Sequence, residues 1–224
     1  MTKPLTPNEW KLSTEQRPFH AATRHLASID ADWTLLVKQV GPCTHLPKPA
    51  REPYEALIRA IAYQQLHAKA GDAILTKFMA LFGGSNFPSP NQILAADLDS
   101  LRTCGFSGRK IETIREIASG SLSGLVPDRK DADRMSDEDL ISRLVTLKGI
   151  GRWTVELFLI YTLERMDIFP ADDFGVREGH RRLKSLPKAL SAKEIAREAQ
   201  RWSPYRTIAA WYLWHVPRDN STKG

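Results

Sequence analysis

The sequence predicts an all-α protein. Apolar residues recur at helical spacing along much of the chain. Helix-capping signals precede several of these segments. No run of residues alternates strictly between apolar and polar with the β-branched enrichment and turn signals typical of strands. With 224 residues, the chain is long enough for one large domain or for two small lobes that share a cleft.

The first half of the chain contains three predicted helical stretches. Residues 53–83 carry apolar side chains at helical spacing, and Gly83-Gly84 ends this stretch. Ser89 is the expected N-cap of a short helix that starts near Pro90. A further helix is expected from about Arg109 to Ser119, because isoleucines recur on one face of that segment.

The second half begins with Ser136–Asp139, which resembles a capping box with an acid in place of the usual Glu or Gln. The helix that it opens should end near Lys148. Residues 153–163 are apolar on nearly every face, which is typical of a helix buried in the middle of a domain. Residues 191–194 form a second candidate capping box, and residues 208–216 are rich in Trp and Tyr.

Composition limits the classes of function. Cys43 and Cys104 are the only cysteines, so a four-cysteine iron–sulfur cluster and a CxxC zinc site are excluded. No stretch approaches the roughly 20 apolar residues that span a bilayer. Residues 1–16 are polar and lack the apolar core of a signal peptide, so we expect an intracellular protein. The net charge of +6 permits a polyanionic partner such as nucleic acid.

The most informative segment is Leu147–Trp153, LKGIGRW, between two predicted helices. Its two glycines allow a tight turn and a close approach of the backbone to another group. The first N–H groups of the following helix would then face an anion such as a DNA phosphate. Taken alone, the segment is equally compatible with a two-glycine connector in any helical protein.

Further residues resolve that choice. The buried helix is followed by Ile168–Phe174, IFPADDF. With this segment the chain resembles the helix–hairpin–helix DNA glycosylases that carry a Gly/Pro-rich loop and an Asp (HhH-GPD), and specifically the AlkA-type 3-methyladenine glycosylases. The likeness runs from about Pro53 to Trp214, and its most specific blocks are AIAYQQLHAKA, LKGIGRWTVE and FPADDF.

The resemblance implies two helical lobes that flank a cleft and contain the helix–hairpin–helix motif. Residues 53–165 should form the central lobe, with the hairpin at 147–153, and the remaining N- and C-terminal segments should form the second lobe. The N-terminal β domain of some longer relatives is expected to be absent. Members of the family rotate a damaged base out of the duplex and hydrolyse its N-glycosidic bond.

The resemblance also assigns roles to site residues. Asp173, the second acid of the pair, corresponds to the catalytic carboxylate, and Asp172 to a neighbour that caps the next helix. Trp153, Phe174 and Trp214 correspond to positions that line the base pocket. Their electron-rich faces would favour a cationic alkylated purine by about 0.5–2 kcal/mol per contact.

Trp153 indicates the subclass. Relatives that also cleave the DNA backbone carry at this position a Lys that forms a Schiff base with the sugar. Because Trp cannot form one, the sequence predicts base removal without strand cleavage. Leu157 stands where some relatives carry Tyr, so the range of substrates stays open: 3-methyladenine, 7-methylguanine, ethenoadenine and hypoxanthine all remain candidates.

The expected partner is double-stranded DNA that contains alkylated bases, with no membrane association and a monomeric protein. Gln65 and His67 are candidates for the side chain that fills the gap left by the flipped base, with His67 favoured. No cofactor is expected to be required. In the family, Na⁺ or K⁺ often binds hairpin carbonyls, here those of Val145, Leu147 and Ile150. The remaining candidate DNA contacts are Lys69, Ser107, Arg109, Lys148, Gly149, Ile150, Gly151 and Arg152.

Three rival interpretations remain. A non-catalytic helix–hairpin–helix module would keep the Gly149/Gly151 turn without needing an acid after the buried helix. A bifunctional glycosylase/lyase would form a covalent adduct with the sugar. A third rival is a protein that recognises lesions without turnover.

Overall fold

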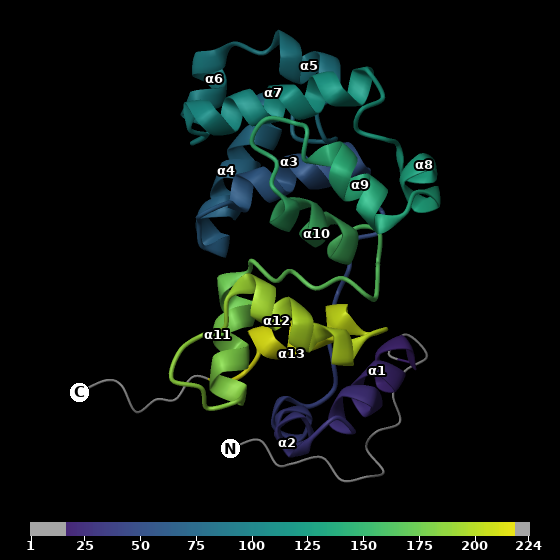
Figure 1. Ribbon diagram of the computed structural model, residues 1–224. Helices are drawn as coiled ribbons and strands as arrows, with labels where there is room; N and C mark the ends of the chain where they lie inside the picture. The colour runs from purple at the N-terminus through teal and green to yellow at the C-terminus, as the bar shows by residue number, and fades with distance from the viewer. Residues whose placement is uncertain (1–16, 218–224) are drawn as a thin grey trace, which may run out of the picture. The chain divides into compact units, whose positions relative to one another are not determined.

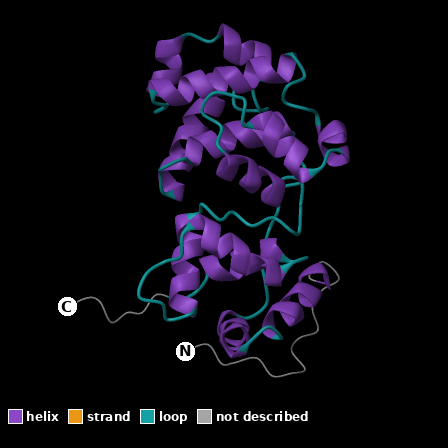
Figure 2. Ribbon diagram, viewed as in Figure 1, coloured by secondary structure: helices purple, strands orange, loops and turns teal. Residues whose placement is uncertain are grey.

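The computed structural model describes residues 17–217. The segment 1–16, on which the expectation of an intracellular protein rests, lies outside the described residues. Over 17–217 the chain is helical, with helices joined by loops and turns and no strand (Figure 2). The predicted all-α class is therefore confirmed for this part of the chain. None of the helices between residues 17 and 217 is long and apolar enough to cross a membrane.

The described residues divide into two compact units, one made of residues 47–165 and the other of residues 17–46 and 166–217. The unit of residues 47–165 is built around α3, which packs against α4, α7 and α10 (Figure 1). Its helices are α3 (Pro53–Tyr63), α4 (Ala68–Leu81), α5 (Pro90–Ala95), α6 (Leu98–Thr103), α7 (Gly108–Leu122), α8 (Arg129–Arg134), α9 (Asp137–Leu144) and α10 (Arg152–Tyr161).

The unit that joins the two ends of the chain is built around α13, which packs against α1, α2 and α11. Trp33, Trp202 and Tyr212 are among its most deeply buried side chains. Trp211, in the segment rich in Trp and Tyr, is also buried in this core, at 6% exposure. The helices of this unit are α1 (Arg17–Ala27), α2 (Ala31–Val40), α11 (Phe174–Leu183), α12 (Ala192–Glu198), the 3₁₀ helix η2 (Ala199–Trp202) and α13 (Arg206–Trp214).

The capping signals have different outcomes. Ser89 and Ser191 both form complete capping boxes, with the N3 side chain bonded to the N-cap N–H. The Ser136 hydroxyl accepts a hydrogen bond from the Asp139 N–H. The same hydroxyl donates a 2.6 Å hydrogen bond to the Asp139 carboxylate, where a capping box would have the Ser136 backbone N–H donate. Asp is one methylene shorter than Glu, so the reciprocal bond to the backbone was wrongly expected there.

Candidate functional site

The hairpin joins α9 to α10 within the unit of residues 47–165. It is closed by a hydrogen bond of 3.1 Å from the Ile150 N–H to the Leu147 carbonyl. Leu147 and Ile150 are buried and anchor the turn to the core. Gly149 has φ +86°, a conformation that only glycine adopts without strain. The predicted tight turn is thus present, and its tip is exposed.

Gly149 is required for a second reason, its close contact with α7. A Cβ atom at Gly149 would lie 2.0 Å from Oγ1 of Thr113, a buried residue of α7. The backbone of the hairpin therefore rests directly on α7, where a larger residue has no room.

The N-terminus of α10 is suited to an anion. Its N-cap, Gly151, has no side chain with which to satisfy the first N–H groups of the helix. These N–H groups and the helix dipole favour a negatively charged ligand at this end. An anion such as a phosphate can supply the acceptor that Gly151 lacks.

The two cationic side chains of the hairpin are held by acids of the protein. Lys148 Nζ lies 2.7 Å from Glu112 Oε2, and the hydrogen bond raises the pKa of the lysine. Arg152 bonds Glu138 through both terminal nitrogens, at 2.9 and 3.1 Å, and bonds Glu156 through Nε at 3.0 Å. Both hairpin cations that the sequence assigned to DNA are thus already paired with carboxylates.

Asp173 lies in the other unit, at the start of α11. It is the N-cap of that helix, and its Oδ1 accepts a 2.8 Å hydrogen bond from the Val176 N–H. The same oxygen accepts a 2.8 Å hydrogen bond from the indole Nε1 of Trp214. The carboxylate is therefore held by two N–H donors and placed at the positive end of a helix dipole. Asp172 is exposed and is not the N-cap, so the cap was assigned to the wrong acid of the pair.

Gly175 allows Asp173 and Trp214 to meet. A Cβ at Gly175 would lie 3.0 Å from Trp214 Cδ1 and 3.1 Å from Asp173 Oδ1. Phe174 begins α11 with 72% of its surface exposed. An aromatic ring left so accessible is available to contact a ligand. Three of the predicted site residues, Asp173, Phe174 and Trp214, are thus brought together in this unit.

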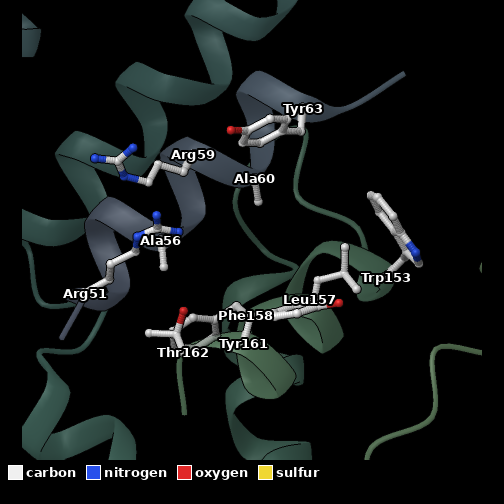
Figure 3. Close-up of a pocket in the computed structure, with 10 residues that line it drawn as sticks. All are labelled: Arg51, Ala56, Arg59, Ala60, Tyr63, Trp153, Leu157, Phe158, Tyr161 and Thr162. Carbon is white, nitrogen blue, oxygen red and sulfur yellow. The ribbon is translucent and has the colours of Figure 1, made fainter. Parts of the chain in front are cut away.

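Trp153 lies in the first turn of α10 and lines a cavity of about 260 Å³ between α10 and α3 (Figure 3). Ala56 and Ala60 face the cavity from α3, and their small side chains leave the space open. The other residues that line it are Arg51, Arg59, Tyr63, Leu157, Phe158, Tyr161 and Thr162.

Two arginines give this cavity positive charge. Arg59 pairs with Glu55 at 2.7 Å, whereas Arg51 is 4.0 Å from the same carboxylate. Burial, followed by repulsion from Arg59, lowers the pKa of Arg51. Tyr63 is fixed at the rim because its hydroxyl donates to Asp72. Of the residues that line this cavity, Trp153 and Leu157 were predicted to bear on the substrate, whereas Arg51, Arg59 and Tyr63 were not.

The turn between α3 and α4 carries the candidate duplex-filling side chains. Gln65 is exposed and has φ +58°, a left-handed conformation that is unusual for a residue other than glycine. His67 is the N-cap of α4, and its Nδ1 accepts a 3.3 Å hydrogen bond from the Ala70 N–H. Lys69 is exposed in the first turn of α4. The capping role of His67 was missed, since Ser, Thr, Asp and Asn are the usual signals.

Ser107 and Arg109 lie at the start of α7. Ser107 is the N-cap of α7 and accepts a 3.3 Å hydrogen bond from the Lys110 N–H. Arg109 is exposed. This junction is thus a capped helix start with one accessible cation, a weaker anion site than the uncapped start of α10.

The candidate cation site consists of backbone oxygen atoms. The Leu147 carbonyl accepts the hydrogen bond that closes the turn, which leaves its second lone pair for an ion. Among the residues that the structure describes, no cluster of three His, Cys, Asp or Glu side chains could hold a metal ion. The carbonyls of Val145, Leu147 and Ile150, at which the resemblance places Na⁺ or K⁺, belong to the turn between α9 and α10.

Residues 58–204 match the family model of the HhH-GPD superfamily base excision DNA repair proteins. DNA-3-methyladenine glycosylase 1 of Schizosaccharomyces pombe is 47% identical over 87% of this chain and 86% of its own length. Alkylbase DNA glycosidase-like protein mag2 of the same organism is 40% identical over 89% of this chain and 94% of its own length.

The fold is shared with a solved complex. The structure of the S. pombe 3-methyladenine DNA glycosylase Mag1 with abasic DNA matches with a TM-score of 0.81 and 46% identity. The match covers 87% of this chain and 95% of that chain.

Proposed function

Since this chain belongs to the HhH-GPD superfamily of base excision DNA repair proteins, we propose that it excises alkylated purines from DNA with Asp173 as its catalytic carboxylate. The chain is a DNA glycosylase of base excision repair. Its relatives are named for 3-methyladenine, and we assign to this chain the same class of substrate, N3- and N7-alkylated purines in double-stranded DNA.

The environment of Asp173 carries the proposal. Two N–H donors, from Val176 and Trp214, hold its Oδ1 at 2.8 Å each. A carboxylate fixed in this way cannot rotate away when positive charge develops near it, so its electrostatic stabilisation needs no reorganisation.

The proposed reaction is hydrolysis of the N-glycosidic bond. The alkylated purine is already cationic, so the C1′–N bond breaks with its electron pair moving to the base. The Asp173 carboxylate stabilises the oxocarbenium-like sugar that remains. A water molecule then adds its oxygen to C1′ and gives up a proton, for which Asp173 is the acceptor. The products are a free base and an abasic sugar.

Trp153, Phe174 and Trp214 are the side chains that we propose hold the base. Each presents an aromatic face, and such a face attracts a cationic purine more than a neutral one. Arg51 and Arg59 oppose this preference within the cavity beside Trp153, since Glu55 offsets only part of their charge. The good leaving ability of an alkylated base must therefore supply part of the selectivity.

The enzyme is a hydrolase without lyase activity, because Trp153 offers no amine for a Schiff base. Lys148 is close in sequence, but its Nζ is paired with Glu112. Borohydride treatment of a reaction with lesion-containing DNA should therefore trap no protein–DNA adduct. A trapped adduct would show the bifunctional rival to be correct.

DNA binding is proposed to rest mainly on backbone groups of the hairpin. The N–H groups of Gly149, Ile150 and Gly151 and the uncapped start of α10 would meet one phosphate, with Na⁺ or K⁺ on the hairpin carbonyls adding positive potential. Lys69 and Arg109 are exposed and add charge elsewhere. Lys148 and Arg152 must share their charge with glutamates, so each should contribute less than an unpaired cation. Ser107 would act through its hydroxyl.

A base-release assay on defined lesions tests the proposal. The substrates are duplexes with one 7-methylguanine, 3-methyladenine, ethenoadenine or hypoxanthine. Wild-type protein should release at least one alkylated base and leave an abasic site. Binding of all lesion duplexes without release of any base would show that the protein is a recognition module rather than a glycosylase.

A further inference from the structure

Lys110 has an unexpected position for a basic residue near a proposed phosphate site. It lies in the first turn of α7 and is half-buried. Its Nζ donates hydrogen bonds to the Ala62 carbonyl at 3.1 Å and to the Gln64 carbonyl at 2.9 Å. These carbonyls belong to the end of α3 and to the residue that follows it. The ammonium group therefore points into the protein and caps the C-terminus of α3.

We propose that Lys110 is a positioning residue that sets the turn 64–67, whose residues Gln65 and His67 are the candidates to enter the duplex during base excision. The proposal rests on the proposed function, because it assigns Lys110 a part in the same reaction. Lys110 contacts no base or phosphate in this role. It acts through the backbone of Gln64, which directly precedes the duplex-facing residues Gln65 and His67.

The backbone of this turn needs to be held. Gln65 has φ +58°, and a left-handed residue with a side chain costs roughly 1 kcal/mol or more. The neighbouring carbonyls at the end of α3 carry the negative pole of the helix dipole, which a lysine ammonium complements. A charged donor bonded to the carbonyl of Gln64 thus fixes the peptide group directly before the strained residue.

A second bond ties the same turn to the hairpin helix. The Gln64 side chain donates through Nε2 to Oγ1 of Thr154 at 3.2 Å. Thr154 is 2% exposed and follows Trp153 in α10. Gln64 is therefore held by its carbonyl from α7 and by its side chain from α10.

The same part of α7 also supports the hairpin. Glu112 pairs with Lys148, and Thr113 lies directly beneath Gly149. Three residues of one helix, at positions 110, 112 and 113, thus contact both the turn 64–67 and the hairpin, the two segments expected to face DNA. Partial burial lowers the pKa of Lys110, as expected for an ammonium group partly withdrawn from solvent. The geometry makes α7 a common support for the turn and the hairpin.

The experiment compares Lys110→Met with Lys130→Met. Met preserves most of the length of the side chain and removes the ammonium group. Lys130 is an exposed lysine of α8 in the same unit, so its loss controls for a change of net charge. Single-turnover base release is measured on two duplexes that carry a lesion released by the wild type. In one the lesion is paired, and in the other it lies opposite an abasic site, where less stacking and pairing must be broken.

Lys110→Met should lower the single-turnover rate roughly tenfold on the paired duplex, because hydrogen bonds from a charged group are lost. On the duplex with an opposing abasic site the loss should stay below about twofold, since flipping there needs less help from the turn. Lys130→Met should match the wild type on both duplexes. An equal loss on both duplexes, or no loss on the paired one, would overturn the proposal.

A second variant keeps the test decisive if Lys110→Met does not fold. Gln64→Met removes the bond to Thr154 and should show the same selective loss on the paired duplex. Equal rates for Gln64→Met and wild type on that duplex would count against the proposal. Failure of the wild type to release any base would instead contradict the proposed function, so the two failures are distinguishable.

Discussion

Replacing Gly149 by Ala should destabilise the hairpin through two separable effects. The left-handed backbone at φ +86° costs an alanine about 1–2 kcal/mol. The new Cβ would also lie 2.0 Å from Thr113 Oγ1, so Thr113 must move within a packed core. Overpacking of this kind costs about 1–3 kcal/mol. The sum predicts that Gly149→Ala lowers the free energy of unfolding by roughly 2–5 kcal/mol.

Two further variants separate the contributions. Gly124 has φ +78° and no atom within 4 Å of its Cβ position, so Gly124→Ala should cost only the backbone share, about 1–2 kcal/mol. Thr113→Ala removes Oγ1 and Cγ2 and leaves the 3.1 Å contact with Thr113 Cβ. In the double variant at 113 and 149, the overpacking share should largely disappear.

Urea unfolding of the wild type, Thr113→Ala, Gly149→Ala and the double variant, with Gly124→Ala alongside, measures the backbone and overpacking contributions to the free energy of unfolding. The coupling between positions 113 and 149 should be about 1–3 kcal/mol, with the double variant more stable than additivity predicts. The same proteins should lose affinity for abasic-site DNA in the order of their hairpin strain. Additive effects within about 0.5 kcal/mol would refute the argument that Gly149 is required by its contact with α7.

Three other predictions follow from single contacts. Trp214→Phe keeps an aromatic ring but removes the N–H that bonds Asp173. Single-turnover base release should fall roughly tenfold, with little change in melting temperature. An unchanged rate would contradict the role of Trp214 in holding the carboxylate. Burial tends to raise the pKa of Asp30, but hydrogen bonds, chiefly from Lys184, outweigh this effect and leave the pKa lowered. The stabilisation of the fold by the ionised Asp30 is therefore present above the unfolded-state pKa and is lost as pH falls through the folded-state pKa. Lys184→Met should therefore destabilise the protein at neutral pH, and its difference from wild type in urea unfolding should shrink on acidification; a difference independent of pH would count against the ion pair. His67→Ala should reduce transition-state stabilisation on paired lesion duplexes by more than about 1 kcal/mol, and a smaller loss in single-turnover kinetics would argue against its insertion into DNA.

Local signals in the sequence were sufficient for much of the fold. Helical spacing predicted the helices at 109–119 and 153–163, and the structure has α7 and α10 there. The two glycines at 149 and 151 predicted the turn between α9 and α10. Gly149 can adopt a positive φ, and Gly151 as N-cap has no side chain with which to cap α10. Both properties follow from glycine as a residue type. The resemblance to the HhH-GPD glycosylases then predicted Asp173 as the catalytic carboxylate.

The contacts that define the site could not be predicted from local patterns. Asp173 and Trp214 are 41 residues apart, and their hydrogen bond depends on how α11 packs against α13. Lys148 looked like a free cation because Glu112, its partner, lies 36 residues earlier on α7. Likewise, no local pattern shows that Lys110 bonds the carbonyls of Ala62 and Gln64, which lie 48 and 46 residues earlier. Which charges are available to DNA is decided by tertiary pairing, which residue type alone does not reveal.

The central claim, that Asp173 performs base excision, is tested most directly by Asp173→Asn beside Asp172→Asn. Both changes remove one negative charge from adjacent positions, and Asn can still cap a helix, so folding should be retained. In single-turnover release of an alkylated base from duplex DNA, Asp172→Asn should stay within about threefold of wild type. Asp173→Asn should lose at least roughly a hundredfold while still binding abasic-site DNA. Wild-type rates for Asp173→Asn would contradict the account.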